Sequence, residues 1–229
     1  MEKFMEEKKI EILKEIKSEA DTRFEEVLGY LEEDSAELES ILGKALTVQM
    51  EELRDHYYSL ENSTPCHMVI SYLRTALLDR HPLYSVAMYD EDFYFSRREC
   101  LVMWDIPEIS EPLYKAVDEL AVKFEKQSKV ESYYLDEIVH TYGDGLHGWF
   151  MNHIPPIIRN HLMEYNWREF YSSNGMCIWA GEYRHQIKRI FKWGKYMEYF
   201  YISQDKRYKN PPSIVNFYDR FYPNLFCVE

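Results

Sequence analysis

Apolar residues recur at intervals of three and four along the first sixty residues of the chain. One series covers residues 13–31 and a second covers residues 38–60, with a polar break at residues 32–35 between them. Spacing of this kind places apolar side chains on one stripe of an amphipathic helix. The pattern therefore predicts two long helices over residues 1–62 that form an antiparallel, coiled-coil-like hairpin.

Beyond residue 63 the apolar pattern changes repeatedly between the spacing of helices and that of strands. Helices are expected at residues 66–79, 110–128, 130–150 (with a bend at the glycines) and 155–170. Aromatic or β-branched runs between polar turns predict strands at residues 84–89, 93–95, 100–104, 176–183, 186–193 and 196–203. The expected fold class is helix-rich α+β, with the hairpin followed by a domain over residues 63–229. In that domain, helices cover an antiparallel sheet of about five to six strands around an aromatic-rich core.

The formal net charge of −13 is concentrated in residues 1–62, where 18 Asp and Glu residues accompany 8 Lys and Arg residues. Nucleic acid and anionic membrane surfaces repel a chain of this charge, so neither is an expected partner. Two amphipathic helices alone cannot bury both of their apolar stripes. We therefore expect residues 1–62 to associate with a second copy of the chain, as a homodimer, or with another protein. Packing onto the rest of the chain is the alternative.

Residues 1–20 alternate charged and apolar side chains, which excludes the continuous apolar run of a secretory signal. No stretch approaches the length of a transmembrane helix. Four cysteines lie far apart and form no C-x-x-C pair: Cys66, Cys100, Cys177 and Cys227. These features predict a cytoplasmic protein with free thiols.

One set of residues has the composition of a metal site, and its members are spaced by three, four and three residues: Glu137, His140, Asp144 and His147. An unbroken helix would place them on one face, and carboxylates and imidazoles bind divalent metal ions. A divalent metal is therefore the one candidate cofactor. The glycine-rich stretch 143–148 argues for a bend that separates the four side chains. A second Glu-x-x-His pair, Glu182 and His185, falls in a predicted strand or turn, where the two side chains are expected to point apart.

Aromatic residues make up 16% of the chain, which contains 20 tyrosines. Tyrosine and tryptophan bury a large ring but keep a polar group that needs a partner, so they line ligand cavities as well as cores. The candidate lining of a small-ligand cavity consists of His140, Tyr142, His147, Trp149 and Trp179. An aromatic core without a ligand is the alternative.

A basic and aromatic segment occupies residues 184–209. Its first cations are Arg184, Lys188, Arg189, Lys192 and Lys195. Cations beside stacking rings bind single-stranded nucleic acid. The same pattern also fits a docking site for an acidic protein surface, or a solvated sheet face.

No motif for nucleophilic catalysis is present, because the chain lacks G-x-S-x-G and a cysteine in a catalytic context. Catalytic residues therefore stay unassigned. The leading hypothesis is a cytoplasmic accessory or regulatory protein that acts through protein–protein interaction and has a small-ligand cavity. The alternatives are a metal-dependent enzyme with its Glu/His cluster at residues 137–147, and single-stranded nucleic-acid binding through residues 184–209.

Overall fold

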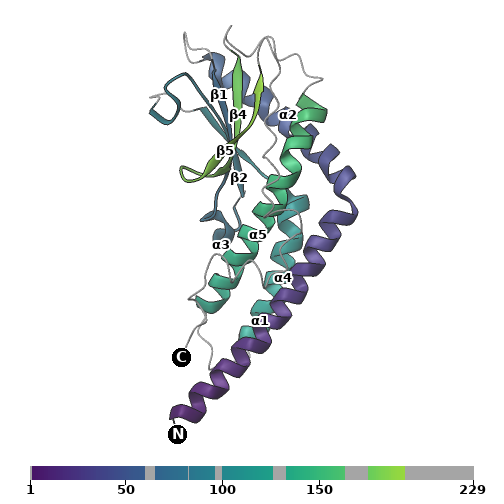
Figure 1. Cartoon of the computed structure of the whole chain (residues 1–229), viewed down its shortest axis with the longest axis vertical. Helices are drawn as coiled ribbons and strands as arrows, with labels where there is room; N and C mark the ends of the chain where they lie inside the picture. Colours follow the sequence, from purple (N-terminus) through teal and green to yellow (C-terminus); the bar gives the residue numbers. More distant parts are fainter. Residues whose placement is uncertain are drawn as a thin grey trace.

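The computed structural model describes residues 2–59, 65–81, 83–95, 100–125, 133–162 and 175–193. The helices are α1 (Glu2–Glu33), α2 (Ser35–Ser59), α3 (Ala76–Asp79), α4 (Pro107–Glu125) and α5 (Tyr133–Ile157), which continues into a π-helical turn, η2 (Ile158–Leu162). The strands are β1 (His67–Tyr72), β2 (Tyr84–Tyr89), β3 (Cys100–Trp104), β4 (Met176–Glu182) and β5 (Ile187–Trp193). This arrangement confirms a helix-rich α+β fold that begins with two helices (Figure 1).

The five described strands form one sheet in the order β3-β2-β1-β4-β5. All neighbouring pairs are antiparallel except β1 and β4, which are parallel. The sheet is therefore mixed, not wholly antiparallel as expected. The connection from β3 to β4 contains α4 and α5, and a long helical crossover of this kind can return the chain in the direction of β1. The predicted strand at 196–203 and the tail beyond it lie outside the described residues.

The two N-terminal helices pack mainly against the rest of the chain. Figure 1 shows α1 running upward beside α4 and α5 to a bend at Asp34, from which α2 continues upward and to the left across the sheet. Ala20, Phe24 and Leu31 of α1 are buried in the same core as the sheet and α5. The apolar stripe of α1 is thus covered within one chain, as in the alternative considered for residues 1–62. Covering this stripe therefore does not require a second copy of the chain.

Residues 66–79 were expected to form a helix, and this was wrong. They contain β1, a short connection and α3. Five of the six residues of β1 are buried, because the strand lies in the middle of the sheet and is covered on both faces. Such a strand has a continuous apolar run, which periodicity cannot distinguish from a buried helix. Residues Phe93–Phe95, expected as a strand, form a 3₁₀ turn, η1.

The glycines of α5 do not interrupt the helix, contrary to expectation, because α5 is continuous from Tyr133 to Ile157. A Cβ atom on Gly143 would lie 2.7 Å from the hydroxyl of Tyr72 and closer still to Leu77. A Cβ atom on Gly145 would lie 2.8 Å from the ring of Phe24. Two positions differ by about 200° around a helix, so these glycines let the sheet and α1 approach α5 from opposite sides.

We predict that Gly143→Ala and Gly145→Ala each lower the free energy of unfolding by about 1–3 kcal/mol, because the added methyl overpacks the core. Gly148 is the matched control, since no atom lies within 4 Å of a Cβ placed there. Gly148→Ala should leave stability unchanged or raise it by up to about 1 kcal/mol through helix propensity. Urea unfolding measures all three variants. Equal effects at the three positions would contradict the close packing.

Candidate functional site

Polar side chains gather where the carboxyl ends of β1 and β4 meet α5. Because these two strands are parallel, their ends lie at the same edge of the sheet, a common place for functional groups. Arg74 follows β1, and Glu182 is the last residue of β4. The guanidinium of Arg74 forms an ion pair with Asp144 of α5, with 3.1 Å between Nη2 and Oδ2. We call Arg74, His140, Asp144 and Glu182 the strand-end cluster.

Burial controls the protonation of the strand-end cluster. Burial raises the pKa of Asp144 to about 6. The positive charge of Arg74 lowers this pKa, but its effect is smaller than that of burial, and the negative charge of Glu182 raises the pKa. Burial also lowers the pKa of His140, and the neighbouring Arg74 lowers it in the same direction. The carboxyl of Asp144 therefore exchanges its proton near neutral pH. A group with such a pKa in a partly exposed position has the property required of a general acid or base.

His147 lies one helical turn beyond Asp144, under the sheet. Its imidazole stacks on the ring of Tyr72, with 4.5 Å between the centroids and 8° between the planes. The ring of Tyr84 lies beside this pair, with 6.1 Å between the centroids of Tyr84 and His147. The ring of Phe150 in turn contacts Tyr84, with 4.2 Å between the centroids of Tyr84 and Phe150. Burial lowers the pKa of His147 to about 4, so the imidazole is neutral at pH 7. His147 thus belongs to the aromatic core.

The four candidate metal ligands lie on one helix, α5, but their side chains have different surroundings. Glu137 is exposed, Asp144 pairs with Arg74, and His147 stacks on Tyr72. Over the described ranges, no three His, Cys, Asp or Glu side chains are placed to hold a metal ion together. The arrangement therefore does not fit a metal centre built from these residues.

The second Glu-x-x-His pair differs from its expectation. Glu182 and His185 lie on either side of a turn, which brings Nδ1 of His185 to 3.2 Å from Oε2 of Glu182. The expectation that they point apart was wrong, because the strand ends at Glu182 and the chain reverses there. Both side chains are well exposed, so the pair contributes little to stability.

The other cavity candidates of α5 face the N-terminal helices. The hydroxyl of Tyr142 donates a hydrogen bond to Asp21, with 3.0 Å between the oxygens, and Nε1 of Trp149 donates to Glu32 at 2.9 Å. His153, one turn further along, lies 3.1 Å from the Glu39 carboxylate. These partners satisfy the polar groups of Tyr142 and Trp149, whose rings are buried.

Trp179, the fifth cavity candidate, belongs to a different group of rings. Its Nε1 donates a hydrogen bond to Nδ1 of His67 at 3.2 Å, and the ring of Phe93 contacts both residues. Together with Val69 and Tyr89 this group forms a second, smaller core. The five candidates therefore do not line one common cavity.

The first basic side chains of 184–209 lie on the β4–β5 hairpin. Arg184 and Lys188 are exposed, and the Arg189 guanidinium lies 5.9 Å from the centre of the Trp179 ring. Lys192 is partly buried, whereas Lys195 lies outside the described residues. Stacking of nucleic-acid bases requires ring faces that are open to solvent. Here the rings of Trp179 and Phe93 contact each other, which favours a protein core over a base-stacking platform.

A groove of about 800 Å³ lies where α1 ends, α2 begins and α4 begins. We call it the acidic groove, and it is lined by Tyr30, Asp34, Glu37, Leu38, Ile41, Pro107, Glu108, Glu111, Pro112 and Lys115. Four of these side chains are exposed carboxylates, and Lys115 is the single cation among them. Leu38 is buried, whereas Tyr30 is 52% exposed. The groove therefore combines negative charge with an exposed aromatic ring.

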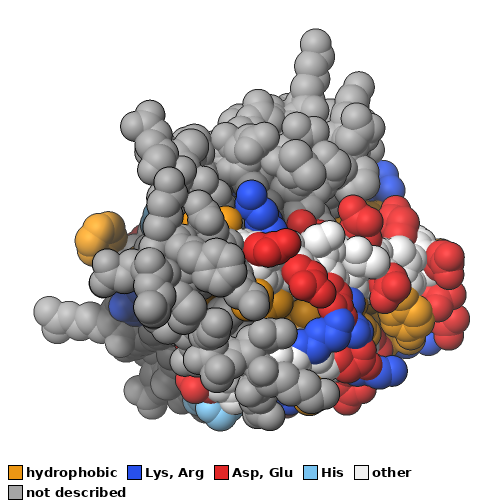
Figure 2. All heavy atoms as spheres, turned by 90° about the horizontal axis from the view of Figure 1, so that it is seen from below, with side chains coloured by type: hydrophobic (Ala, Val, Ile, Leu, Met, Phe, Trp, Pro, Cys, Tyr) orange, Lys and Arg blue, Asp and Glu red, His pale blue; other side chains and the backbone are white. Residues whose placement is uncertain are grey.

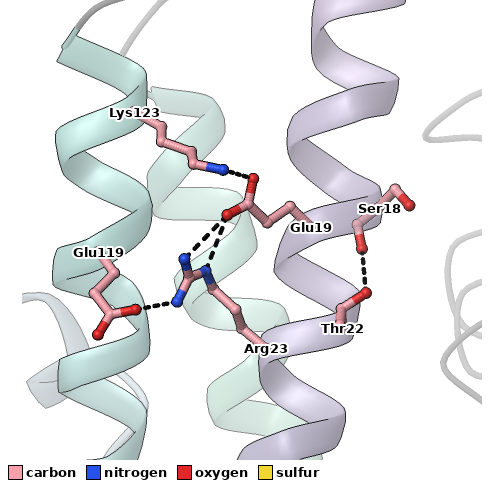
Figure 3. Close-up of polar contacts among 6 residues, drawn as sticks. All are labelled: Ser18, Glu19, Thr22, Arg23, Glu119 and Lys123. Carbon is pink, nitrogen blue, oxygen red and sulfur yellow. Dashed lines mark hydrogen bonds and ion pairs between the residues drawn. The ribbon is translucent and has the colours of Figure 1, made fainter.

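Ion pairs join the two helices that flank the acidic groove. Glu19 of α1 accepts hydrogen bonds from Arg23 and from Lys123 of α4, and Arg23 also contacts Glu119 (Figure 3). These pairs set α1 and α4 in antiparallel register, which places the end of α1 beside the start of α4. Surface ion pairs stabilise a fold little, so their main effect here is on orientation. Seen from below, acidic side chains gather along one side of the molecule (Figure 2).

Sequence reasoning missed the acidic groove. Its signals were the acidic run at residues 32–37 and the prolines that begin α4, but about 70 residues separate them.

No family model, no curated protein and no solved structure matches this chain.

Asp144 and His147 should affect stability in opposite directions between about pH 4 and pH 6.5. The native state binds the Asp144 proton more tightly than the unfolded chain does, so the contribution of Asp144 to the free energy of unfolding is lost as pH rises through about 6. The native state binds the His147 proton more weakly than the unfolded chain does, so the contribution of His147 to the free energy of unfolding grows as pH rises from about 4. Each is on the order of 3 kcal/mol from the size of the shift, and the two largely cancel.

We therefore predict that Asp144→Asn makes the free energy of unfolding rise more steeply with pH over this range than in the wild type. His147→Phe, which retains a ring against Tyr72, should make it fall with pH. The double variant should return to the wild-type slope. Urea unfolding at several pH values measures these slopes, and identical slopes in all four proteins would contradict the assigned shifts.

Proposed function

We propose that the protein is a non-catalytic accessory protein that holds a basic segment of a partner protein in the acidic groove. The observation that carries this proposal is the lining of the groove, where Asp34, Glu37, Glu108 and Glu111 surround an open hollow with one lysine. Carboxylates arranged in this way attract cationic side chains, and Tyr30 offers a ring on which a cation can lie.

The burial of the apolar stripes supports a partner that is recognised by charge. Phe24 and Leu31 are buried in the core of the chain, so α1 presents its polar side outward. Exposed carboxylates accelerate the encounter with a basic partner and make binding sensitive to salt. An accessory protein that binds and releases its partner requires contacts of this kind.

The cytoplasm is the proposed location. Cys66, Cys100 and Cys177, which the structure describes, are not joined by disulfide bonds. Unbridged cysteines are typical of a reducing compartment. No helix in the described parts of the chain is both long enough and apolar enough to cross a bilayer.

A second candidate function is the binding of a small ligand at the strand-end cluster. The pKa of about 6 at Asp144, beside Arg74 and His140, supports proton exchange with a bound molecule. The version in which a metal-dependent enzyme uses Glu137 and His147 has less support, because the imidazole of His147 is stacked in the core. Nucleic-acid binding has less support still, because the rings of the β4–β5 region contact one another.

The groove proposal predicts that a labelled octalysine peptide binds the protein at low salt and that Glu108→Lys with Glu111→Lys weakens binding about tenfold or more. The loss reflects two attractive contacts turned into repulsive ones, at roughly 1 kcal/mol or less for each exposed charge. Fluorescence anisotropy at two salt concentrations measures the affinity.

Glu11→Lys with Glu15→Lys is the matched control, because it makes the same change in net charge at exposed positions of α1 outside the groove. This control should bind the peptide nearly as well as the wild type. An equal loss in both double variants would show a response to net charge alone and would contradict the groove as the binding site.

A further inference from the structure

The β4–β5 hairpin carries the charge that the acidic groove lacks. Among residues 176–193, Glu182 is the single acidic residue, whereas Arg184, Lys188, Arg189 and Lys192 are basic. The turn at residues 183–186 joins the two strands, and Arg184, His185 and Lys188 at or next to it are exposed. The tip of the hairpin is thus a compact, positively charged projection.

The hairpin and the acidic groove of one molecule lie on opposite sides of the fold. Figure 1 shows the turn between β4 and β5 on the left of the sheet, whereas the junction of α1 and α2 is on the right. The hairpin is bonded into the sheet along β4, so it cannot cross to the groove of its own chain. A basic hairpin in the acidic groove must therefore come from another molecule.

We infer that the occupant of the acidic groove is the β4–β5 hairpin of a second copy of this chain. This inference rests on the proposed function of the groove. The charges are complementary, because four carboxylates would receive the guanidinium of Arg184 and the ammonium of Lys188. A hollow of about 800 Å³ is large enough for the side chains of a hairpin tip, but not for a whole domain.

This contact joins two different surfaces, so it is heterologous. Each chain then offers one groove and one hairpin, and the copies assemble head to tail into a ring or an open chain. The association depends on exposed charges and weakens as salt screens them. The homodimer expected from the apolar pattern of residues 1–62 would instead depend on buried apolar area and resist salt.

The test uses two full-length double variants. The groove variant carries Glu108→Lys and Glu111→Lys, and the hairpin variant carries Arg184→Glu and Lys188→Glu. We expect the wild type to form assemblies that grow with concentration at low salt and dissociate at high salt. Each variant alone should be monomeric, because one half of every contact is reversed. A mixture of the two should assemble again, because the intact hairpin of the groove variant meets the intact groove of the hairpin variant.

Analytical ultracentrifugation measures the assemblies, and circular dichroism establishes that both variants are folded. The Glu11→Lys, Glu15→Lys control should assemble like the wild type. Mixed variants that stay monomeric, or a groove variant that still self-associates, would overturn the inference. A wild type that is monomeric at every concentration but binds octalysine would overturn the inference alone and leave the groove function intact. If octalysine does not bind either, both proposals fail.

Discussion

The structure depends on the close approach of the sheet and α1 to the two sides of α5. On one side Gly143 admits Tyr72 of the sheet, and on the other Gly145 admits Phe24 of α1. Phe24 also stacks on Tyr142 of α5, with 4.6 Å between the centroids. A side chain at either glycine would hold a layer away from α5. The two glycines therefore let one helix contribute to both halves of a continuous core.

The docking of α1 determines what the molecule offers to others. Once its apolar stripe lies against α4 and α5, its outward surface is polar and mostly acidic. The antiparallel register of α1 and α4, fixed in part by Arg23 and Lys123, brings the acidic end of α1 beside the first turns of α4. The acidic groove follows from that register. The self-recognition that we propose is therefore based on charge, in place of the apolar contact that the helical pattern alone favoured.

Local pattern predicted the fold class, both N-terminal helices and the strands β2, β3, β4 and β5, because alternation and turn residues are properties of neighbouring positions. It failed at β1, where burial on both faces removes the alternation. It also failed at Gly143 and Gly145, which contact Tyr72 and Phe24 from distant parts of the chain. Prediction of the candidate site from the sequence failed for the same reason. The sequence indicated Asp144 and His140, but their neighbour Arg74 and the acidic groove arise only when separate elements meet.

The most direct test of the central claim is the stability of Phe24→Ala, measured by urea unfolding in high salt, where charge-dependent association is suppressed. Phe24 is 4% exposed and lies between Tyr142 and Gly145. If α1 is part of the core of its own chain, the substitution lowers the free energy of unfolding by about 3–5 kcal/mol. The wild-type midpoint should then be the same over a hundredfold range of protein concentration. A loss below about 1 kcal/mol, or a midpoint that rises with concentration, would contradict this account.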